Sequence, residues 1–423
     1  MIDLKQLREA PETFRDAVKH KNETADIDKI LSLDERRREL LQEGDSLKHR
    51  RNIVSEEIGQ KKKAGKDASD QIAAMQEVAS KIKSIDAELK DVEDKLDALL
   101  LTVPNVPHET VPVGTDESAN VEIRTWGAVS GFDFAPLNHT EIGAQLGLFD
   151  FERGAKISGT GFPLYTNLGA KLERALLNFM IDFHVEHHGY TEVMPPLLVN
   201  RDSMKNTGQL PKLEEDMYYI DSDDLFLIPT AEVPVTNIHK GEILKEDELP
   251  RKYVAFTPCF RREAGSHGRE TRGFLRVHQF NKVEMVQMVR PEESYDVLET
   301  LTAHAEAILQ ALDLPYRVLA LSTGDLSFAA AKCYDLEIWA PGEDRWLEVS
   351  SCSNFVDFQA RRANIRFRRA STGHTEYVHT LNGSGVATAR LLASLLEVHQ
   401  TKDGSVELPG VLEPYLGTTT LQK

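Results

Sequence analysis

Cysteine is scarce in this sequence, and the few cysteines are poorly placed for cross-linking or metal binding. The chain of 423 residues has 3 cysteines, Cys259, Cys333 and Cys352, which are odd in number and far apart. No Cys-x-x-Cys pair or His/Cys cluster has the spacing of a zinc site. These absences exclude a disulfide framework and a cysteine zinc site, and we expect no zinc.

Long apolar runs are also missing. No segment approaches the roughly 18 apolar residues that a membrane-spanning helix needs, and no apolar run follows the charges near the N-terminus. The contents of 41% hydrophobic and 28% charged residues are ordinary globular values. We therefore expect a cytoplasmic protein with no membrane partner, long enough for two domains.

Two further absences restrict how the chain can bind nucleotides and nucleic acids. It has no glycine-rich loop of the Walker or dinucleotide type, so side chains would have to hold ATP. Its net charge of −18 argues against general affinity for nucleic acid, because phosphate binding needs a local excess of Lys and Arg. Any contact with RNA must therefore use a local patch.

Residues 27–101 have the pattern of two long helices joined by a polar turn. In the second limb, apolar residues alternate steps of three and four: Met75, Val78, Ile82, Ile85, Leu89, Val92, Leu96 and Leu99. The first limb repeats this rhythm more weakly, through Ile30, Leu33, Leu40, Leu47, Val54 and Ile58, with Arg37, Gly44 and Arg51 at interrupted positions. The glycine and charges of residues 60–67 mark an exposed tip, so the limbs should fold back antiparallel.

Charge is divided unequally between these limbs. Residues 36–66 contain ten basic and five acidic residues, a difference of +5, whereas residues 67–97 contain four basic and nine acidic, a difference of −5. One limb and the tip, with Lys61, Lys62, Lys63 and Lys66, therefore offer phosphates a partner. A solvated coiled coil whose charges only keep it soluble has the same composition.

Prolines at 104 and 107 stop the second limb. They predict an N-terminal domain at 1–103, a linker at 104–120 and a second domain at 121–423. In that domain an apolar helical stripe runs from Leu168 to Phe183 and ends near His188-Gly189. Short β-rich segments at 224–228, 253–260, 279–289 and 345–349 predict an α+β fold on a mainly antiparallel sheet. Residues 408–423 have the composition of a loosely held tail.

Three segments carry side chains suited to chemistry. Residues 260–284 gather arginines around Arg261-x-Glu263, and guanidinium forks suit phosphates and carboxylates, although an arginine-rich surface hairpin shows the same pattern. Residues 382–385 predict a glycine turn before a helix that bears Arg390. The strand at 346–354 carries Glu348 and Ser351, whose hard oxygen atoms suit magnesium.

Together, in this order, the helix before Pro195-Pro196, the Phe-Arg-x-Glu loop at 260–263 and the helix bearing Arg390 resemble the three motifs of class II aminoacyl-tRNA synthetases. Strings similar to the bacterial seryl branch occur at 230–232, 268–273, 276–280, 323–326, 330–337 and 382–385. The resemblance covers nearly the whole chain. It implies the class II antiparallel sheet flanked by helices, with an N-terminal antiparallel two-helix coiled-coil arm.

The resemblance also implies an activity and its partners. A serine–tRNA ligase activates serine with ATP to seryl-adenylate and transfers serine to the 3′ end of tRNA(Ser), and selenocysteine tRNA stays open as a second acceptor. The N-terminal domain would bind the tRNA through its arm. The helix of motif one and the strand that reaches Pro195-Pro196 would form a homodimer interface.

Site roles follow from the resemblance position by position. Arg261 would bind the α-phosphate of ATP and the serine carboxylate, which Arg276 would help to orient, and Arg390 would hold the γ-phosphate. Glu263 would meet the adenine amino group and Phe280 would stack on adenine. The full implied set is Arg261, Arg262, Glu263, Val277, Phe280, Glu348, Val349, Ser350, Ser351 and Arg390 for ATP; Glu348 and Ser351 for Mg²⁺; Thr230 and Glu232 for the serine ammonium, and Glu284 and Ser384 for its hydroxyl.

The chain departs from the family pattern at two positions. Arg262 stands where the family usually has Ser, and Ala389 stands where it commonly has Gly. Neither change removes a catalytic group. The alternatives are a catalytically altered paralogue, such as an amino-acid:carrier-protein ligase or a regulatory binding protein, and a synthetase for threonine or proline; threonyl enzymes use a zinc site that these cysteines do not offer.

Overall fold

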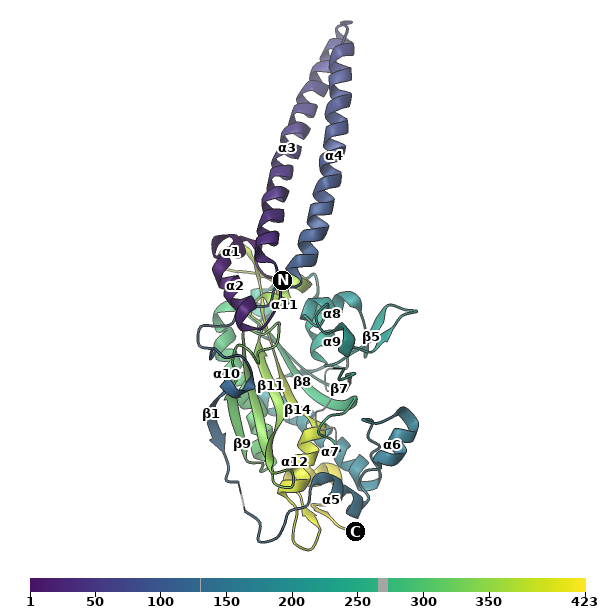
Figure 1. Ribbon diagram of the computed structural model, residues 1–423, viewed down its shortest axis with the longest axis vertical. Helices are drawn as coiled ribbons and strands as arrows, with labels where there is room; N and C mark the ends of the chain where they lie inside the picture. Colours follow the sequence, from purple (N-terminus) through teal and green to yellow (C-terminus); the bar gives the residue numbers. More distant parts are fainter. Residues whose placement is uncertain (130, 265–272) are drawn as a thin grey trace. The chain divides into compact units, whose positions relative to one another are not determined.

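The structure is a computed structural model that describes residues 1–129, 131–264 and 273–423. It forms two compact units (Figure 1). One contains Ile2–Lys19 and Glu23–Pro104, and the other contains Met1, His20–Asn22 and Asn105–Lys423. Of the family string at 268–273, residues 268–272 lie outside the described residues.

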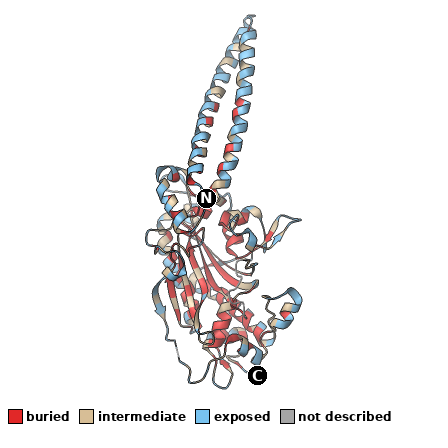
Figure 2. Cartoon of the chain, viewed as in Figure 1, coloured by how far each residue is buried: buried red, intermediate tan, exposed pale blue. Residues whose placement is uncertain are grey.

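The first unit is built around the expected arm. After α1 (Leu4–Glu9) and α2 (Pro11–His20), α3 (Ile27–Lys63) and α4 (Ser69–Leu100) run antiparallel beside each other (Figure 1). Leu40, Ile85 and Val92 form a buried seam cluster, while most of the arm's surface is exposed (Figure 2). Gly44 faces Ile85, whose Cγ2 would lie 3.5 Å from an added Cβ. The antiparallel two-helix arm is thus confirmed.

Ion pairs between the two helices use part of the basic charge of α3. Arg36 pairs with Glu88, Arg37 with Glu93 and Lys48 with Asp86, at 2.7, 3.0 and 2.9 Å. The four tip lysines are exposed. The basic charge that faces solvent therefore concentrates toward the distal part of the arm.

An eight-stranded sheet forms the centre of the second unit, in the order β1-β9-β10-β11-β14-β8-β7-β2. Every neighbouring pair is antiparallel except β2 and β7. The predicted antiparallel α+β fold is confirmed. The strands are β1 (Val121–Trp126), β2 (Thr191–Glu192), β7 (Arg251–Phe260), β8 (Gln279–Val289), β9 (Tyr316–Ala320), β10 (Lys332–Ala340), β11 (Arg345–Asn354) and β14 (His379–Ala387).

Helices α7 (Asn167–His188), α10 (Ser294–Ala311) and α12 (Thr388–Val398) pack against this sheet. The predicted apolar stripe lies on α7, where Leu172, Leu176 and Phe179 are buried. Gly189 ends the helix in the left-handed region at φ 68°, which a residue without Cβ adopts at low cost. The stripe therefore fills the core beneath the sheet.

Shorter elements complete this unit. Two small sheets contain β3 (Leu198–Asn200), β4 (Tyr219–Ile220) and β5 (Leu225–Leu227), and β6 (Ile243–Lys245), β12 (Arg366–Arg368) and β13 (Thr375–Tyr377). The remaining helices are α5 (His139–Leu146), α6 (Phe151–Ser158), α8 (Arg201–Thr207), α9 (Glu232–Thr236), α11 (Phe358–Ala363) and α13 (Glu413–Leu416). In the described part of the chain, no helix is long and apolar enough to cross a membrane.

The expected glycine turn at 382–385 is wrong, because these residues lie within strand β14. An added Cβ would lie 2.8 Å from Cys352 Sγ at Gly383 and 2.6 Å from His184 Nε2 at Gly385. The glycines therefore permit close packing of a buried strand against its neighbours, and the pairing of this strand with β8 is irregular between Ser384 and Ala387.

The expectation of a loose C-terminal tail is also wrong. Strand β15 (Val406–Glu407) pairs with β16 (Thr420–Leu421), and α13 lies between them in the chain. Leu412, Leu416 and Leu421 are buried in the main core. Leu412 and Leu416 are four residues apart, so they lie on one face of a helical segment. This spacing is typical of a face that packs against a core, even in a short segment.

Candidate functional site

One cavity of about 710 Å³ opens over the strands of the main sheet. Residues of β7, β8, β11, β14 and α12, together with the loops between them, contribute to its wall. It brings together fourteen of the sequence-predicted side chains: Thr230, Glu232, Arg261, Glu263, Arg276, Val277, Phe280, Glu284, Glu348, Val349, Ser350, Ser351, Ser384 and Arg390.

The structure does not bring Arg262 into this set. Its side chain is exposed and does not line the cavity. Its backbone N–H donates to the carbonyl of Asp216 at 2.8 Å, which fixes the chain where it leaves β7. The added positive charge at this position therefore faces solvent.

A buried polar cluster forms the acidic end of the cavity. The register of β8 and β14 places Glu284 opposite Ser384. The Thr230 hydroxyl donates to Glu284 Oε2 at 3.0 Å and accepts from Lys282 Nζ at 2.9 Å. Lys282 also forms an ion pair with Glu284. The buried carboxyl of Glu284 therefore has a cation and a hydroxyl directly beside it.

Glu232, the first residue of α9, is the second buried carboxyl in this end of the cavity. Gln359 Nε2 donates to its Oε1 at 2.6 Å and Gln209 Nε2 to its Oε2 at 3.4 Å. Burial and the nearby negative charge of Glu284 raise the pKa of Glu232 to about 7. An incoming cation would favour the charged form of this carboxyl.

The Ser384 hydroxyl faces the same end. It is buried, and its Oγ has no hydrogen-bond partner among the described residues. A buried hydroxyl without a partner costs free energy, which a small polar ligand would recover by supplying a hydrogen bond. The acidic end therefore matches a ligand that carries both a cation and a polar group.

Arginines and an aromatic ring form the other end. The Arg261 guanidinium lies over the Phe280 ring, 5.2 Å from its centroid, and its Nε donates to the Pro229 carbonyl at 3.3 Å. Arg276 donates to Glu263 at 2.7 Å. Glu263 has φ 51°, so the backbone turns sharply where the carboxylate meets Arg276.

Arg390 lies in the first turn of α12. Its Nη1 pairs with Glu348 Oε2 at 3.1 Å, and its Nε donates to the Leu275 carbonyl at 3.2 Å. Nearby, burial chiefly raises the pKa of Asp335 well above its usual range, and Glu348 adds to the shift. Together with the Ser351 hydroxyl, these carboxyl groups give the wall the hard oxygen donors that fit a divalent cation.

Lys282, Asp335 and Gln359 are among the contributors to the site that sequence reasoning missed. Lys282 and Asp335 line the cavity, and Gln359 reaches Glu232 from α11. Alternation along β8 carried a signal for Lys282, because it shares a strand face with Glu284 two residues later. Gln359 lies 127 residues from its partner, and no local pattern identifies such a contact.

Comparisons with known proteins cover both units. A family model described as "Seryl-tRNA synthetase N-terminal domain" matches residues 1–107, and one for the "tRNA synthetase class II core domain (G, H, P, S and T)" matches residues 215–399. Serine–tRNA ligases of Desulfitobacterium hafniense and Thermodesulfovibrio yellowstonii are 55% and 54% identical, covering 99% and 100% of both chains.

Solved structures agree with these matches. The seryl-tRNA synthetase of Pyrococcus horikoshii, complexed with ATP, superimposes with a TM-score of 0.94 at 38% identity, covering 100% of this chain and 99% of that one. The cytoplasmic serine–tRNA ligase of Naegleria fowleri, in complex with AMP, gives 0.88 at 32% identity with the same coverage. This chain therefore belongs to the seryl-tRNA synthetase family of class II aminoacyl-tRNA synthetases.

Proposed function

We propose that the chain activates serine with ATP in this cavity and then transfers serine to the 3′ end of tRNA(Ser). The observation that carries the proposal is the composition of the cavity's two ends. Buried carboxyls and an unpartnered hydroxyl lie at one end, and three arginines with an aromatic ring lie at the other. This division suits an amino acid on one side and a nucleotide on the other.

At the acidic end, Glu232 and Thr230 bind the serine ammonium, and Glu284 and Ser384 bind its hydroxyl. The raised pKa of Glu232 supports the first role, because a bound ammonium replaces the solvation that burial removes. Lys282 forms an ion pair with Glu284 and orients it. A substrate without the hydroxyl would leave these buried groups unpaired, which selects against alanine and glycine.

At the basic end, Arg261 binds the α-phosphate and the serine carboxylate, while Arg390 binds the γ-phosphate. The serine carboxylate attacks the α-phosphorus, pyrophosphate leaves, and Arg261 stabilises the negative charge that develops. Phe280 stacks on adenine and Glu263 accepts from its amino group. The reaction needs no covalent enzyme intermediate, since the chain supplies position and charge.

The wall of the cavity also fits a divalent cation. Glu348 and Ser351 would hold Mg²⁺, which supplies charge neutralisation to phosphate oxygens when bound. The fit rests on their oxygen atoms and on the buried carboxyl of Asp335 beside them. On binding Mg²⁺, Glu348 would give up its ion pair with Arg390, and the Arg390 guanidinium would then be available to the nucleotide.

The arm serves as the tRNA-binding element. Helix α3 has 37 residues, which at ~1.5 Å per residue gives a length of about 55 Å. The exposed tip lysines, on an otherwise acidic chain, supply phosphate contacts. The long variable arm of tRNA(Ser) would then be recognised by shape and backbone, without reading the anticodon.

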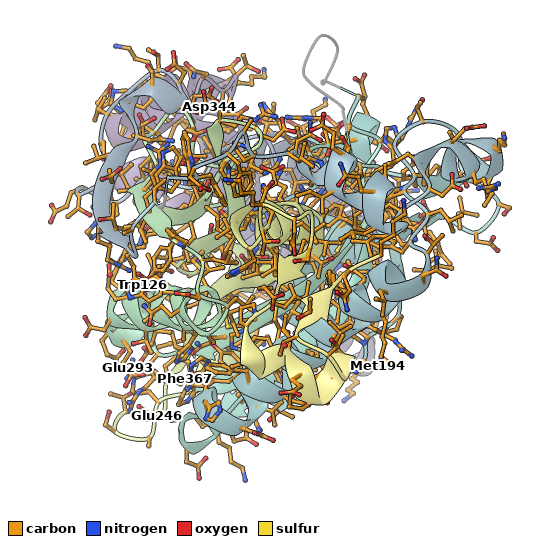
Figure 3. The ribbon with its side chains drawn as sticks, turned by 90° about the horizontal axis from the view of Figure 1, so that it is seen from below. Trp126, Met194, Glu246, Glu293, Asp344 and Phe367 are labelled. Carbon is orange, nitrogen blue, oxygen red and sulfur yellow. The ribbon has the colours of Figure 1, made fainter. Side chains whose placement is uncertain are left out.

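The chain acts as a cytoplasmic homodimer. Apolar side chains support the dimer where motif one reaches its prolines: Met194 is 87% exposed (Figure 3), and Leu197 and Leu198 are 36% and 40% exposed. An exposed apolar patch beside motif one, the expected dimer interface, is suited to burial against a second copy of this chain. Sedimentation of the chain at micromolar concentration tests this, and a fully active species of 47.5 kDa would count against it.

Pyrophosphate exchange with each proteinogenic amino acid tests the activation step. Serine alone should support efficient exchange, and Glu284→Ala should abolish most of it. Glu306→Ala is the matched control, because Glu306 is also buried and hydrogen-bonded, to Arg124 and Tyr316, but lies outside the cavity wall. Near-normal serine exchange by Glu284→Ala would refute the hydroxyl assignment. A carrier-protein ligase would activate an amino acid yet leave tRNA(Ser) uncharged.

A further inference from the structure

A buried cluster outside the catalytic set joins three distant parts of the second unit. It contains His139, Glu343 and Glu397, whose side-chain nitrogen and oxygen atoms lie within 4.8 Å of one another. His139 begins α5, Glu397 lies on α12, and Glu343 follows β10. The composition resembles a metal-ligand set, so the hydrogen bonds of each group decide what the cluster does.

Protein donors already satisfy Glu397. Its Oε1 accepts from the backbone N–H and the Nδ1 of His139, at 2.9 and 2.8 Å. Its Oε2 accepts from the backbone N–H groups of Gly342 and Glu343, at 2.9 and 3.2 Å. The backbone N–H of His139 is an orphan donor at the N-terminus of α5, because the Asn138 side chain caps the N–H groups of the next two residues. Glu397 is therefore a structural acceptor for several backbone donors.

The other ring nitrogen of His139 points to the nucleotide end of the cavity. The backbone N–H of Phe274 donates to His139 Nε2 at 3.2 Å. An imidazole nitrogen that accepts carries no proton, so Nδ1 carries it and donates to Glu397. Glu397 thereby fixes the tautomer in which His139 can hold Phe274. The chain of contacts runs from α12 through α5 to Phe274.

Gly273 shows how closely the main chain lies against this imidazole. Its φ is +59°, and an added Cβ would lie 2.2 Å from His139 Nε2 and 2.5 Å from Thr140 Cγ2. No side chain fits there without a shift of α5. The main chain therefore enters the cavity wall directly over the ring of His139.

The residues that follow Gly273 form part of the nucleotide end of the cavity. Phe274, Leu275, Arg276 and Val277 all line the cavity. The Leu275 carbonyl accepts from Arg390 Nε at 3.2 Å, and Arg276 pairs with Glu263 at 2.7 Å. Helix α12 thus holds this segment at two points, directly through Arg390 and indirectly through Glu397 and His139.

We infer that His139, oriented by Glu397, is a positioning residue that fixes Gly273–Arg276 for nucleotide binding. The inference rests on the proposed function, because it assigns the held segment to the ATP end of the cavity. His139 does not itself line the cavity. It determines where the Leu275 carbonyl and the Arg276 guanidinium lie.

Two substitutions of His139 distinguish the roles of its two ring nitrogens. In His139→Asn the shorter amide reaches the Nδ1 position, so donation to Glu397 is kept and Phe274 N–H loses its acceptor. In His139→Gln the amide oxygen reaches the Nε2 position and accepts from Phe274. We expect the dissociation constant for ATP, measured without serine on the full chain, to rise about tenfold in the Asn variant and less than about threefold in the Gln variant.

His399→Asn is the matched control. His399 follows α12, is half-buried, and hydrogen-bonds the Leu312 carbonyl at 3.0 Å, away from the cavity wall. It should lower the melting temperature without changing ATP affinity. Equal ATP affinities for the Asn and Gln variants, or weakening that follows melting temperature across all three, would overturn the inference. If the unsubstituted chain lacked serine-dependent pyrophosphate exchange, the proposed function itself would fail instead.

Discussion

The raised pKa of Glu232 predicts how serine use depends on pH. The value of about 7 arises from burial and from Glu284, so this carboxyl changes charge within the range in which the enzyme can be assayed. It is ionised to about 90% at pH 8 and about 10% at pH 6. Because the ionised form attracts the serine ammonium, kcat/KM for serine should fall roughly tenfold as the pH is lowered from 8 to 6.

The assay is serine-dependent pyrophosphate exchange at saturating ATP, between pH 6 and pH 8. Glu232→Gln keeps the shape of the side chain and removes its titration. The variant should be poor at both pH values, and its kcat/KM for serine should vary little between them. If the variant kept the tenfold slope, a group other than Glu232 would be responsible and the reasoning would be refuted.

Three further outcomes follow from other parts of the structure. Gly383→Ala places a Cβ 2.8 Å from Cys352 Sγ inside a packed sheet, so thermal or urea unfolding should show a loss of about 1–3 kcal/mol; an unchanged midpoint would contradict this. Arg390→Ala should weaken ATP binding more than serine binding in exchange assays, and a reversed order would disprove its phosphate role. Replacing Lys61, Lys62, Lys63 and Lys66 by Gln should flatten the salt dependence of tRNA binding while leaving serine activation intact, whereas equal slopes would make the arm a solvated coiled coil.

Much of the architecture could be predicted because it depends on periodicity. The three-and-four steps of the second arm limb specify α4, and the stripe from Leu168 to Phe183 specifies α7. The segment predicted at 279–289 coincides with β8. Each of these patterns is local, repeats several times, and reports which face of the element is buried.

The errors arose where one residue type serves two structural purposes. Glycine at 383 and 385 suggests a turn from local sequence alone, but in the fold it makes room for Cys352 and His184, which lie far away in the sequence. The apolar residues of the C-terminal segment form no long periodic pattern, and the folded core shows that Leu412 and Leu416 are buried. Contacts such as Gln359 with Glu232 likewise depend on the tertiary fold. The resemblance to a family identifies candidate site residues that periodicity cannot, and fourteen of them line one cavity.

The ion pairs between Arg390 and Glu348 and between Arg276 and Glu263 have a consequence for ligand affinity. Each of these two guanidinium groups already has a carboxylate partner in the structure, so its positive charge is compensated. If these arginines bind the nucleotide as proposed, binding is an exchange of partners, and its free energy is the difference between two pairings. The existing partners hold the arginines close to their working positions, and they also limit the affinity that those arginines can provide.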